Sequence, residues 1–356
     1  MGPGPSNVSP DVAQALARPL TGHLDPEFLR ILDEVSERLR AVFRTSNRIT
    51  FAVSGTGSAG MEAALVNVLE PGDEAIVGVN GVFGERMADI AGRCGATVVR
   101  VEAPWGEAIA AADVAAALRA HPRARVVALV HAETSTGVAQ PVAEIAELVG
   151  RYAALFVLDC VTSLGGMPVE VDAWGVDVCY SGTQKCLSVP PGLAPITFSD
   201  RAMDVVRARR APPQSWYLDV TMLERYWGSE RVYHHTAPVA MITALHAGLG
   251  LLLAEGLEAS WDRHARTARL LMDGLCARGF VYVPNESLRL PMLHCVRLPA
   301  GVDEADTRRC LLTDFGVEVG AGLGPFRGEC WRIGLMGYTC TERNVRTLLG
   351  ALDQVL

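Results

Sequence analysis

The stretch that organises this chain is Ser-Gly-Thr-Gln-Lys-Cys-Leu at residues 181–187. Its lysine, Lys185, follows a predicted strand at 176–180 and precedes a Pro-Pro-Gly loop at 190–192. The residues around Lys185 are small and polar, whereas a solvated lysine normally lies among other charges on a helix face. A desolvated lysine amine stays partly neutral, as Schiff-base chemistry requires. We therefore expect the amine of Lys185 to point into a cavity.

A second candidate group, Asp159, ends the apolar run at 154–158. A carboxylate at the end of one buried strand and a lysine at the end of a later one are the two protein groups that pyridoxal phosphate needs. The carboxylate pairs with the pyridinium nitrogen, and the lysine forms the Schiff base. On these two residues alone, an unrelated buried aspartate and a loop lysine remain an open alternative.

Composition indicates a globular enzyme. The 356 residues are 49% hydrophobic and 20% charged, and this length predicts two domains. The net charge of −8 disfavours nucleic acid and anionic membranes as partners. The nine cysteines form no Cys-x-x-Cys pair, which indicates reduced thiols in a cytosol-like compartment. The eight histidines lack metal-ligand spacing, so we expect no metal site.

No pattern in the chain predicts export or membrane insertion. Met1 is followed by Gly-Pro-Gly-Pro at 2–5, without a basic or an apolar signal region. The longest apolar helix candidate, at 238–253, contains glycines and is too short to span a bilayer. We therefore expect a cytoplasmic protein that does not associate with membranes.

Strand and helix patterns alternate from about residue 50 to residue 207, after an amphipathic helix at 26–43. Strands are predicted at 50–53, 74–79, 97–101, 125–131, 154–159, 176–180 and 194–198. Helices are predicted at 61–70, 85–94, 112–120, 141–152 and 200–207. Several strands are unbroken apolar runs, as in strands covered on both faces. The pattern predicts an α/β fold with a mainly parallel sheet between helix layers, and such sheets bind ligands at the carboxyl ends of their strands.

The pattern changes after residue 207. The segment 211–236 is rich in proline and aromatic residues. Helices are then predicted at 238–253, 259–278, 303–315 and 342–355, and strands at 290–298, 317–320 and 331–335. We predict an N-terminal arm (1–20), a large cofactor-binding domain (21–255) and a smaller α+β C-terminal domain (256–356).

A glycine-rich loop, Ser-Gly-Thr-Gly-Ser-Ala-Gly at 54–60, lies between a predicted strand and a predicted helix. Its free backbone N–H groups and the helix dipole predict a phosphate site. The loop also matches Gly-x-Gly-x-x-Gly, the dinucleotide fingerprint, but the next strand ends in Gly-Val-Asn-Gly at 78–81, without the acidic residue that the fingerprint requires. A NAD-dependent dehydrogenase and an ordinary turn without a ligand remain as alternatives.

Further motifs accompany these sites along the whole chain. They are Gly-Pro-Gly-Pro-Ser-Asn (2–7), Ser-Gly-Thr-Gly (54–57), Leu-Glu-Pro-Gly-Asp (69–73), Gly-Val-Asn-Gly (78–81), Ser-Thr-Gly-Val (135–138), Ser-Leu-Gly-Gly (163–166), Ser-Gly-Thr-Gln-Lys (181–185), Tyr-His-His-Thr (233–236) and Trp-Arg-Ile-Gly (331–334). In this combination the chain resembles the class V, fold-type I pyridoxal-phosphate aminotransferases of the alanine–glyoxylate and serine–pyruvate group. The resemblance extends from residue 2 to about residue 352.

The resemblance implies roles for individual residues. Lys185 resembles the lysine that binds the cofactor and moves the substrate proton, and Asp159 resembles the pyridinium partner. The other implied cofactor contacts are Thr56, Gly57, Ser58 and Gln184 at the phosphate, Phe83 and Val161 on the ring faces, and Thr134 near the 3′-oxygen. Phe83 stands where this group often has tryptophan, and Ser58 where some relatives have histidine. We expect the smaller stacking area to weaken cofactor retention somewhat.

The resemblance also implies substrate and subunit contacts. Arg332 resembles the arginine that binds the substrate carboxylate, which its forked guanidinium suits, although a structural ion pair is the competing interpretation. Ser6 and Asn7 are expected to close over the same carboxylate. Tyr233 and Thr236 resemble residues that reach the cofactor phosphate of the neighbouring subunit, which implies a homodimer with shared active sites. An aromatic-rich core segment is the alternative for that pair.

The implied reaction is a ping-pong transamination from alanine or serine to glyoxylate or pyruvate. The (S)-ureidoglycine–glyoxylate aminotransferases of purine catabolism are an alternative, because stretches at 185–197 and 331–338 also resemble that branch. Against it, Tyr233 stands where asparagine is expected, and His23 where glutamine is expected. A catalytically silent cofactor-binding regulator is a further alternative, which the intact set of lysine, aspartate and arginine disfavours.

Overall fold

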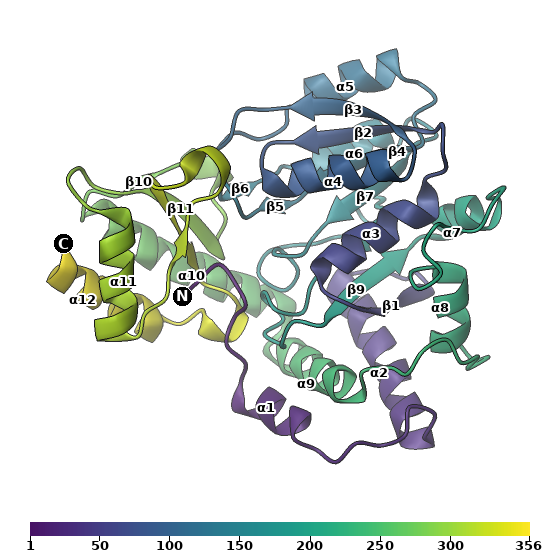
Figure 1. Cartoon of the computed structure of the whole chain (residues 1–356), viewed down its shortest axis with the longest axis horizontal. Coiled ribbons are helices and arrows are strands. Elements are labelled where there is room, and N and C mark those ends of the chain that lie inside the picture. Colours follow the sequence, from purple (N-terminus) through teal and green to yellow (C-terminus); the bar gives the residue numbers. More distant parts are fainter.

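The computed structural model describes residues 1–356 and has a seven-stranded sheet at its centre (Figure 1). The strand order is β1-β9-β8-β7-β4-β2-β3. These strands are β1 (Ile49–Ser54), β2 (Glu74–Val79), β3 (Thr97–Glu102), β4 (Val126–Val130), β7 (Leu155–Asp159), β8 (Val178–Tyr180) and β9 (Leu193–Phe198). Only β9 runs antiparallel to its neighbours, β1 and β8, and the other pairs are parallel. The predicted mainly parallel sheet is confirmed.

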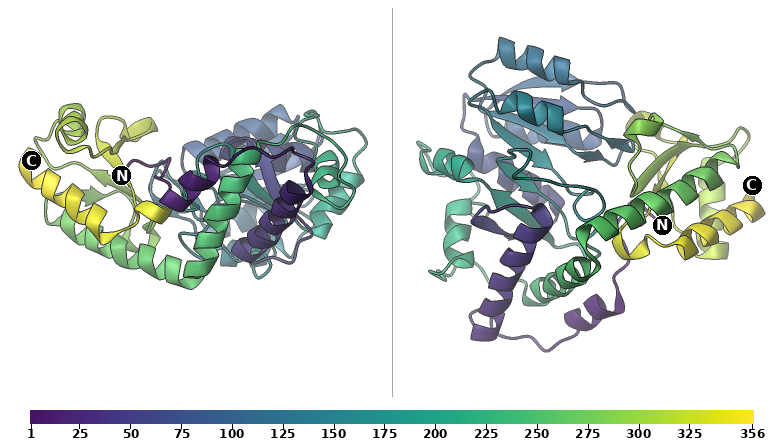
Figure 2. Two further views of the ribbon diagram at one scale, coloured as in Figure 1. Left: turned by 90° about the horizontal axis from the view of Figure 1, so that it is seen from below. Right: turned by 180° about the vertical axis from the view of Figure 1, so that it is seen from behind.

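Helices cover both faces of this sheet (Figures 1 and 2). The helices of this part of the chain are α1 (Pro10–Leu16), α2 (Pro26–Phe43), α3 (Gly57–Val68), α4 (Val82–Arg93), α5 (Ala111–Ala120), α6 (Ala143–Val149), α7 (Asp200–Arg207), α8 (Val220–Trp227) and α9 (Val239–Glu255), of which α1 packs against α9. Because both faces are covered, the central strands are buried along their whole length. A short hairpin of β5 (Ala132–Glu133) and β6 (Val138–Ala139) follows β4.

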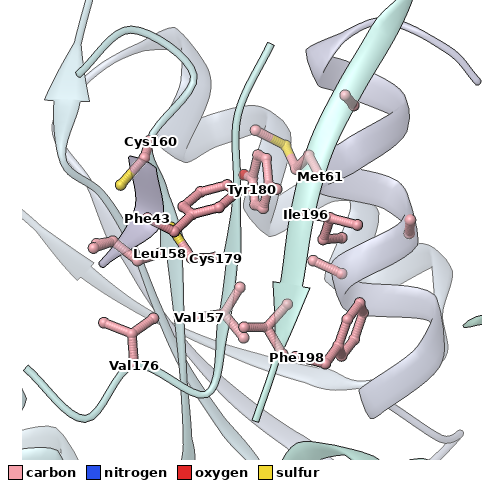
Figure 3. Packing of buried hydrophobic residues seen from close by; sticks show 14 of the residues in the cluster. Phe43, Met61, Val157, Leu158, Cys160, Val176, Cys179, Tyr180, Ile196 and Phe198 are labelled. Carbon is pink, nitrogen blue, oxygen red and sulfur yellow. The ribbon is translucent and has the colours of Figure 1, made fainter. Parts of the chain in front are cut away.

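The sheet and α3 pack closely where the sheet approaches the cavity described below (Figure 3). Met61 of α3 lies close to Tyr180 and Ile196 of the sheet in this layer. A Cβ atom at Gly60 would lie 3.0 Å from the Cβ of Ala194 and 3.4 Å from that of Tyr180. The close contact holds the first turn of α3 at the carboxyl edge of the sheet.

The C-terminal part has its own sheet and its own core. Its strands follow the order β10-β11-β13-β12: β10 (Val281–Tyr282), β11 (Leu293–Arg297), β13 (Cys330–Gly334) and β12 (Gly320–Ala321). Helices α10 (Leu257–Cys276), α11 (Glu304–Phe315) and α12 (Glu342–Val355) accompany them, with single 3₁₀ turns at Glu286–Leu288, Gly324–Phe326 and Gly337–Thr339. A core of 16 buried residues lies here, separate from the 75-residue core around the large sheet, as expected for two domains.

The two parts meet where α9 bends into α10 at Gly256, which has a φ of 91°. No single helix is long and apolar enough to cross a membrane. Helices α9 and α10 meet the criteria of length and composition only when they are taken together, and they are bent by 82° at their junction.

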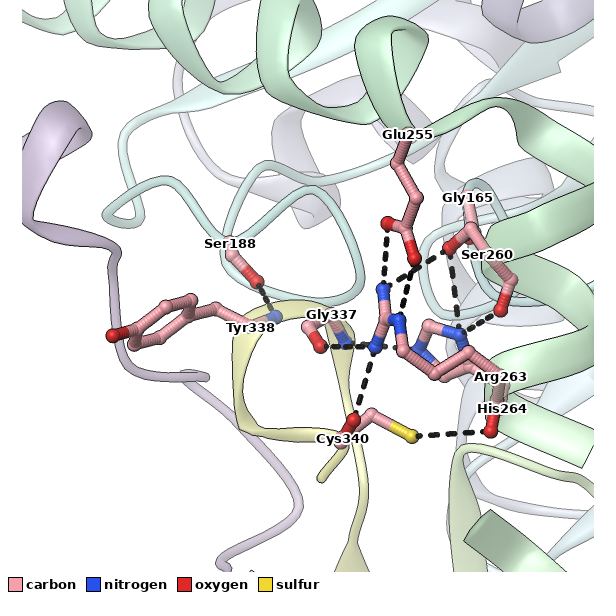
Figure 4. Close-up of polar contacts among 9 residues, drawn as sticks. All are labelled: Gly165, Ser188, Glu255, Ser260, Arg263, His264, Gly337, Tyr338 and Cys340. Atoms are coloured by element: carbon pink, nitrogen blue, oxygen red, sulfur yellow. Dashed lines mark hydrogen bonds and ion pairs between the residues drawn. The ribbon is translucent and has the colours of Figure 1, made fainter. Parts of the chain in front are cut away.

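Arg263 holds the junction of α9 and α10 together (Figure 4). Its guanidinium donates to both carboxylate oxygens of Glu255, at 2.6 and 2.8 Å, and to the carbonyl oxygens of Gly337 and Cys340, at 2.9 and 3.1 Å.

The junction also contacts the loop that carries Lys185. The hydroxyl of Ser188 accepts a hydrogen bond from the backbone N–H of Tyr338 at 2.8 Å. Ser188 has a φ of 52°, a left-handed conformation that serine rarely adopts. The lysine loop is therefore tied directly to the small domain.

Several predicted element boundaries are wrong, for local reasons. Helix α3 begins at Gly57 rather than at residue 61, so the predicted phosphate loop is the first turn of the helix. Helix α6 begins at Ala143 rather than at 141, where the side chain of Gln140 binds the carbonyl oxygen of Pro141. The predicted strand at 317–320 is reduced to Gly320–Ala321, because the N–H of Val317 bonds back to the end of α11.

Two helices were not predicted. Helix α8 lies inside the segment predicted only as rich in proline and aromatic residues, where the side chain of Asp219 caps it by accepting from the N–H of Thr221. Helix α1 lies within the predicted N-terminal arm, and its cap, Ser9, accepts from the N–H of Val12. Both begin with a capping side chain that the hydrophobic periodicity does not reveal.

Candidate active site

A cavity of about 150 Å³ lies at the carboxyl ends of β4 and β7. Nine residues that the sequence analysis assigns to the cofactor line it: Thr56, Gly57, Ser58, Phe83, Thr134, Asp159, Val161, Gln184 and Lys185. Five other residues complete the lining: Met61, Arg86, Val130, Ala132 and Thr162. The fold thus brings together groups from five separate stretches of the chain.

Lys185 is the only lysine in the sequence, since every other basic residue among the 32 is an arginine. Burial, assisted by the positive charge of Arg332, lowers the pKa of the Lys185 amine to about 8. Part of the amine population is therefore neutral near neutral pH, as a nucleophile requires. The amine donates to the carbonyl oxygen of Pro3, so the first residues of the chain pack directly against it.

Asp159 ends β7 and is 3% exposed. One carboxylate oxygen accepts from the N–H of Val161 at 2.8 Å, and the other accepts from the hydroxyl of Tyr180 at 2.9 Å. Burial raises the pKa of Asp159 to about 7, and both hydrogen bonds oppose this rise. A cationic ring nitrogen would stabilise the ionised carboxylate further, so the pair suits the predicted partnership.

Tyr180 is a site residue that the sequence analysis missed. It lies directly opposite Asp159 in the register of β7 and β8, and it is fully buried. Its hydroxyl orients the carboxylate of Asp159. The available signal was its place at the end of the strand just before the Ser-Gly-Thr-Gln-Lys motif, but pairing with Asp159 depends on strand register.

Replacing Asp159 with asparagine should stabilise the cofactor-free protein while reducing turnover. The carboxyl of Asp159 has a folded-state pKa of about 7, above its ordinary value, so the folded state loses stability as pH rises through 7. Asp159→Asn should therefore raise the melting temperature by a few degrees at pH 8, with little gain at pH 4. The loaded variant should lose most of its turnover, because a neutral amide does not favour a protonated ring nitrogen.

Thermal melts of the cofactor-free variant at both pH values, together with kcat of the loaded variant, check this prediction. Asp177→Asn is a matched control, since that buried carboxylate is paired with Arg201 and lies outside the cavity. A kcat within about threefold of the parent protein would remove Asp159 from the role of ring partner.

The first turn of α3 forms the opposite end of the cavity. Thr56 is its N-cap residue, and the Thr56 side chain makes no capping hydrogen bond. The Thr56 hydroxyl and the unpaired N–H groups of the turn are thus available to an anion. The side-chain oxygen of Gln184 is buried here without a hydrogen-bond partner. A buried polar group without a partner indicates a site that a polar ligand completes, and the Gln184 amide can offer its NH2 group to a phosphate oxygen.

These residues fit pyridoxal phosphate: hydroxyl and N–H donors at one end, a buried carboxylate at the other, and a single amine between them. When bound, the cofactor supplies an electron sink for substrate carbanions. Lys185 would hold it and move the substrate proton, Asp159 would keep its ring nitrogen protonated, and α3 with Gln184 would bind its phosphate.

Phe83 is positioned by a buried carboxylate. Glu133 accepts from the backbone N–H groups of Phe83 and Gly84, at 3.1 and 3.3 Å, and from that of Ser135 at 3.0 Å. It thereby satisfies free N–H groups at the start of α4. Burial raises the pKa of Glu133 in spite of these bonds. Glu133 is therefore a structural residue that fixes the ring of Phe83 at the cavity.

Arg332 lies in β13, close enough for its charge to act on Lys185. Its Nε donates to the carbonyl oxygen of Ala321 at 2.9 Å, and no carboxylate of the chain forms an ion pair with it. Burial lowers the pKa of its guanidinium. The structural ion pair considered as the alternative is absent, and the remaining guanidinium donors are free to bind a carboxylate.

The predicted contact of Ser6 and Asn7 with the substrate carboxylate stays a prediction, and the structure gives Ser6 further partners. The hydroxyl of Ser6 donates to the carbonyl oxygen of Lys185 at 2.8 Å, and its N–H donates to that of Gln184 at 2.8 Å. Ser6 thus fastens the lysine loop, and its hydroxyl proton is not available for a substrate. Asn7 is exposed and forms no side-chain hydrogen bond. The N-terminal residues contact the lysine and its loop through Pro3 and Ser6.

Tyr233 and Thr236 do not line the cavity of their own chain. Tyr233 is 58% exposed, and its hydroxyl lies 3.4 Å from that of Thr236. The alternative of a buried aromatic core segment does not hold for Tyr233. The two hydroxyls lie together at the surface, where a second molecule can approach them.

Comparisons with known proteins agree with this geometry. The family described as aminotransferase class-V matches residues 12–343. The crystal structure of an alanine–glyoxylate aminotransferase from Nostoc sp. is 46% identical, with a TM-score of 0.98 over 100% of this chain and 94% of that one. The ureidoglycine–glyoxylate aminotransferase structure from Bacillus subtilis is 41% identical, with a TM-score of 0.98 over 100% and 92% of the two chains. The alanine–glyoxylate aminotransferase of Callithrix jacchus is 42% identical over 100% of this chain and 87% of its own length.

These matches cover the whole cavity and both domains. The dehydrogenase alternative is wrong, because the glycine-rich loop belongs to the phosphate end of this cavity rather than to a dinucleotide site. The cofactor implied by the family is pyridoxal phosphate, in agreement with the fit of the lining residues. The chain belongs to the class-V aminotransferases.

Proposed function

We propose that this protein transfers the amino group of a small amino acid, alanine or serine, to a small oxo acid, glyoxylate or pyruvate. The observation that carries the proposal is the single lysine, with its lowered pKa, between the buried Asp159 and the unpaired Arg332. Every amino-acid and oxo-acid substrate carries a carboxylate that Arg332 can bind. A silent cofactor-binding regulator needs no free guanidinium beside its lysine.

The side chains at positions 23 and 233 favour alanine or serine over ureidoglycine as the donor. The rings of His23 and Tyr233 lie 5.5 Å apart and tilted, so the two residues form one aromatic pair. The ureidoglycine branch is expected to have glutamine and asparagine there, whose amides can both donate to and accept from a ureido group. Two aromatic rings can form fewer hydrogen bonds with a ureido group, which supports a small donor without one.

A screen of donors against acceptors tests the proposal. The loaded protein is incubated with alanine, serine or ureidoglycine and with glyoxylate or pyruvate, and the loss of one oxo acid and gain of another are followed. We expect alanine or serine with glyoxylate to give the highest kcat/KM. Preference for ureidoglycine would transfer the protein to the alternative branch, and absence of turnover with every pair would overturn the proposal.

We also infer a cytoplasmic homodimer with active sites completed across the subunits. Exposed aromatic side chains gather around the His234–His235 pair: Trp216 stacks on His234 at 4.4 Å, and Tyr217 packs against both histidines. Trp216 and Tyr233 are 59% and 58% exposed. An exposed aromatic surface of this kind is typical of a protein interface, and a second copy of the chain is the occupant that would bring Tyr233 and Thr236 to a cofactor.

Mixing two inactive variants should restore activity if the sites are shared. Lys185→Ala lacks the amine, and Tyr233→Phe/Thr236→Ala lacks the hydroxyls supplied in trans. Random exchange between them would give mixed dimers with one intact site each, so about a quarter of the wild-type activity should return. Activity that stays flat after proven subunit exchange would contradict the shared site. A mixture of Lys185→Ala with Asp159→Asn is the control, because both residues line the cavity of one chain. Each site of a mixed dimer then lacks one of the two groups, so this mixture should regain no activity.

A further inference from the structure

Arg86 is the only cation besides Lys185 among the residues that line the cofactor cavity. It projects from α4, and its Nη1 donates to the hydroxyl of Ser58 at 2.9 Å. Its guanidinium carbon lies 5.0 Å from the centre of the Phe83 ring. The charge is thus held between the first turn of α3 and the aromatic ring that lines the cavity.

The charge of Arg86 is not neutralised by any carboxylate of the chain. Its acidic neighbours on α4 bind other arginines: Glu85 binds Arg100 at 2.6 Å, and Asp89 binds Arg93 at 2.8 Å. Asp159, the carboxylate in the cavity lining, is bound to Val161 and Tyr180. Arg86 is exposed, and its uncompensated charge is accessible to a ligand in the cavity that it lines.

The position of the Arg86 guanidinium favours binding of an anion. The N-terminal end of a helix carries a partial positive charge, and a cation beside it is unfavourable unless an anion lies between them. Here Arg86 is hydrogen-bonded to the second residue of α3. The side-chain amide of Gln184 in the same lining has a buried oxygen without a partner, which indicates that a polar ligand completes this site. The same amide can donate its NH2 group to an anion.

We propose that Arg86 binds and neutralises the phosphate of the bound cofactor, with Ser58 holding its guanidinium at the N-terminus of α3. The inference rests on the proposed function, because it takes pyridoxal phosphate as the bound group. The residues assigned to the phosphate from the sequence, at 56–58 and 184, are neutral, so they supply hydrogen bonds but no charge. Arg86 supplies the charge, and a guanidinium fork matches two phosphate oxygens. The hydroxyl of Ser58 accepts from Arg86, which leaves its own proton free to donate to a phosphate oxygen.

Affinity measurements with and without the phosphate group test this role. The full-length protein is freed of cofactor and titrated separately with pyridoxal phosphate and with pyridoxal, with the fluorescence of its six tryptophans as the signal. Arg86→Gln should weaken pyridoxal phosphate binding by about 10- to 100-fold, as for the loss of a charge-assisted hydrogen bond. Its affinity for pyridoxal should stay within about twofold of the parent protein, because the missing contact is to the phosphate alone. Inorganic phosphate should compete with pyridoxal phosphate in the parent protein and only weakly in the variant.

Arg93→Gln is the matched control, since Arg93 lies on the same helix but is paired with Asp89 and exposed. It should leave both affinities unchanged. Equal weakening of pyridoxal phosphate and pyridoxal by Arg86→Gln would overturn the proposal, because Arg86 would then act through the ring of Phe83. Unchanged pyridoxal phosphate affinity would overturn it as well. A parent protein that binds no pyridoxal phosphate would instead contradict the proposed function, so the two failures are distinguishable.

Discussion

Replacing Lys185 with alanine should abolish covalent attachment of the cofactor and reduce turnover by about 10⁴-fold, since general acid–base catalysis alone contributes about 10²–10⁴. Lys185 is the only lysine of the chain, so no other side-chain amine can substitute for it. Borohydride reduction of the loaded parent protein, followed by intact mass measurement, should show one cofactor added per chain. Peptide mapping should place it on Lys185, and the Lys185→Ala protein should remain unmodified.

The Lys185→Ala protein should still bind the cofactor without a covalent bond, because the phosphate end of the cavity and Asp159 are unchanged. Equilibrium dialysis measures this retained binding and serves as the control for folding. Attachment at the α-amino group of Met1, or none in the parent protein, would remove Lys185 from the centre of the site.

Replacing Arg332 with alanine should lower kcat/KM for the donor and for the acceptor together, by about 10²–10³-fold. One guanidinium serves both half-reactions, because the donor and the acceptor each present one carboxylate to it. The covalently bound cofactor content should stay at the parent level, because Arg332 does not line the cofactor cavity. Arg332→Lys should recover only part of the loss, because an ammonium does not reproduce the two-pronged geometry.

The matched control for Arg332 is Arg297→Ala, on the neighbouring strand β11, where the arginine is paired with Glu329. This exposed ion pair should contribute little to stability, and Arg297→Ala should leave KM unchanged. A lowered melting temperature of Arg332→Ala with a normal KM would assign Arg332 a structural role. The amine of Lys185 provides a second readout, because removal of the Arg332 charge should raise the pKa of Lys185 towards its ordinary value. The rate at which an amine-specific reagent modifies this single lysine should then fall near pH 8.

The site could be located from the sequence because its main residues lie at the ends of locally recognisable elements. Asp159 ends an apolar strand, and Lys185 follows the next one. Parallel strands align their carboxyl ends at one edge of a sheet, so the two groups meet whatever the detailed packing. The glycine-rich turn at 54–60 is likewise a local signal, and its place at the same edge follows from the alternation of strands and helices.

Contacts that depend on strand register or on distant segments cannot be predicted from the sequence. The hydrogen bond of Tyr180 to Asp159 requires the register of β7 and β8, and the approach of Pro3 to Lys185 joins positions 182 residues apart. Arg86 looks like any exposed helical arginine until its acidic neighbours are seen to bind other residues. Ser6 was expected at the substrate but binds the lysine loop.

The sequence by itself thus determined the fold class, the family and the two groups that the cofactor needs. These follow from hydrophobic periodicity, strand ends and motif spacing, which are properties of short stretches. Only the tertiary structure decided which charges remain free: Arg332 and Arg86 are without a carboxylate, whereas Arg93, Arg201 and Arg297 are paired. Pairing depends on which side chains the fold brings within a few ångströms, and side chains from distant parts of the chain meet only once the sheet and its helices have packed.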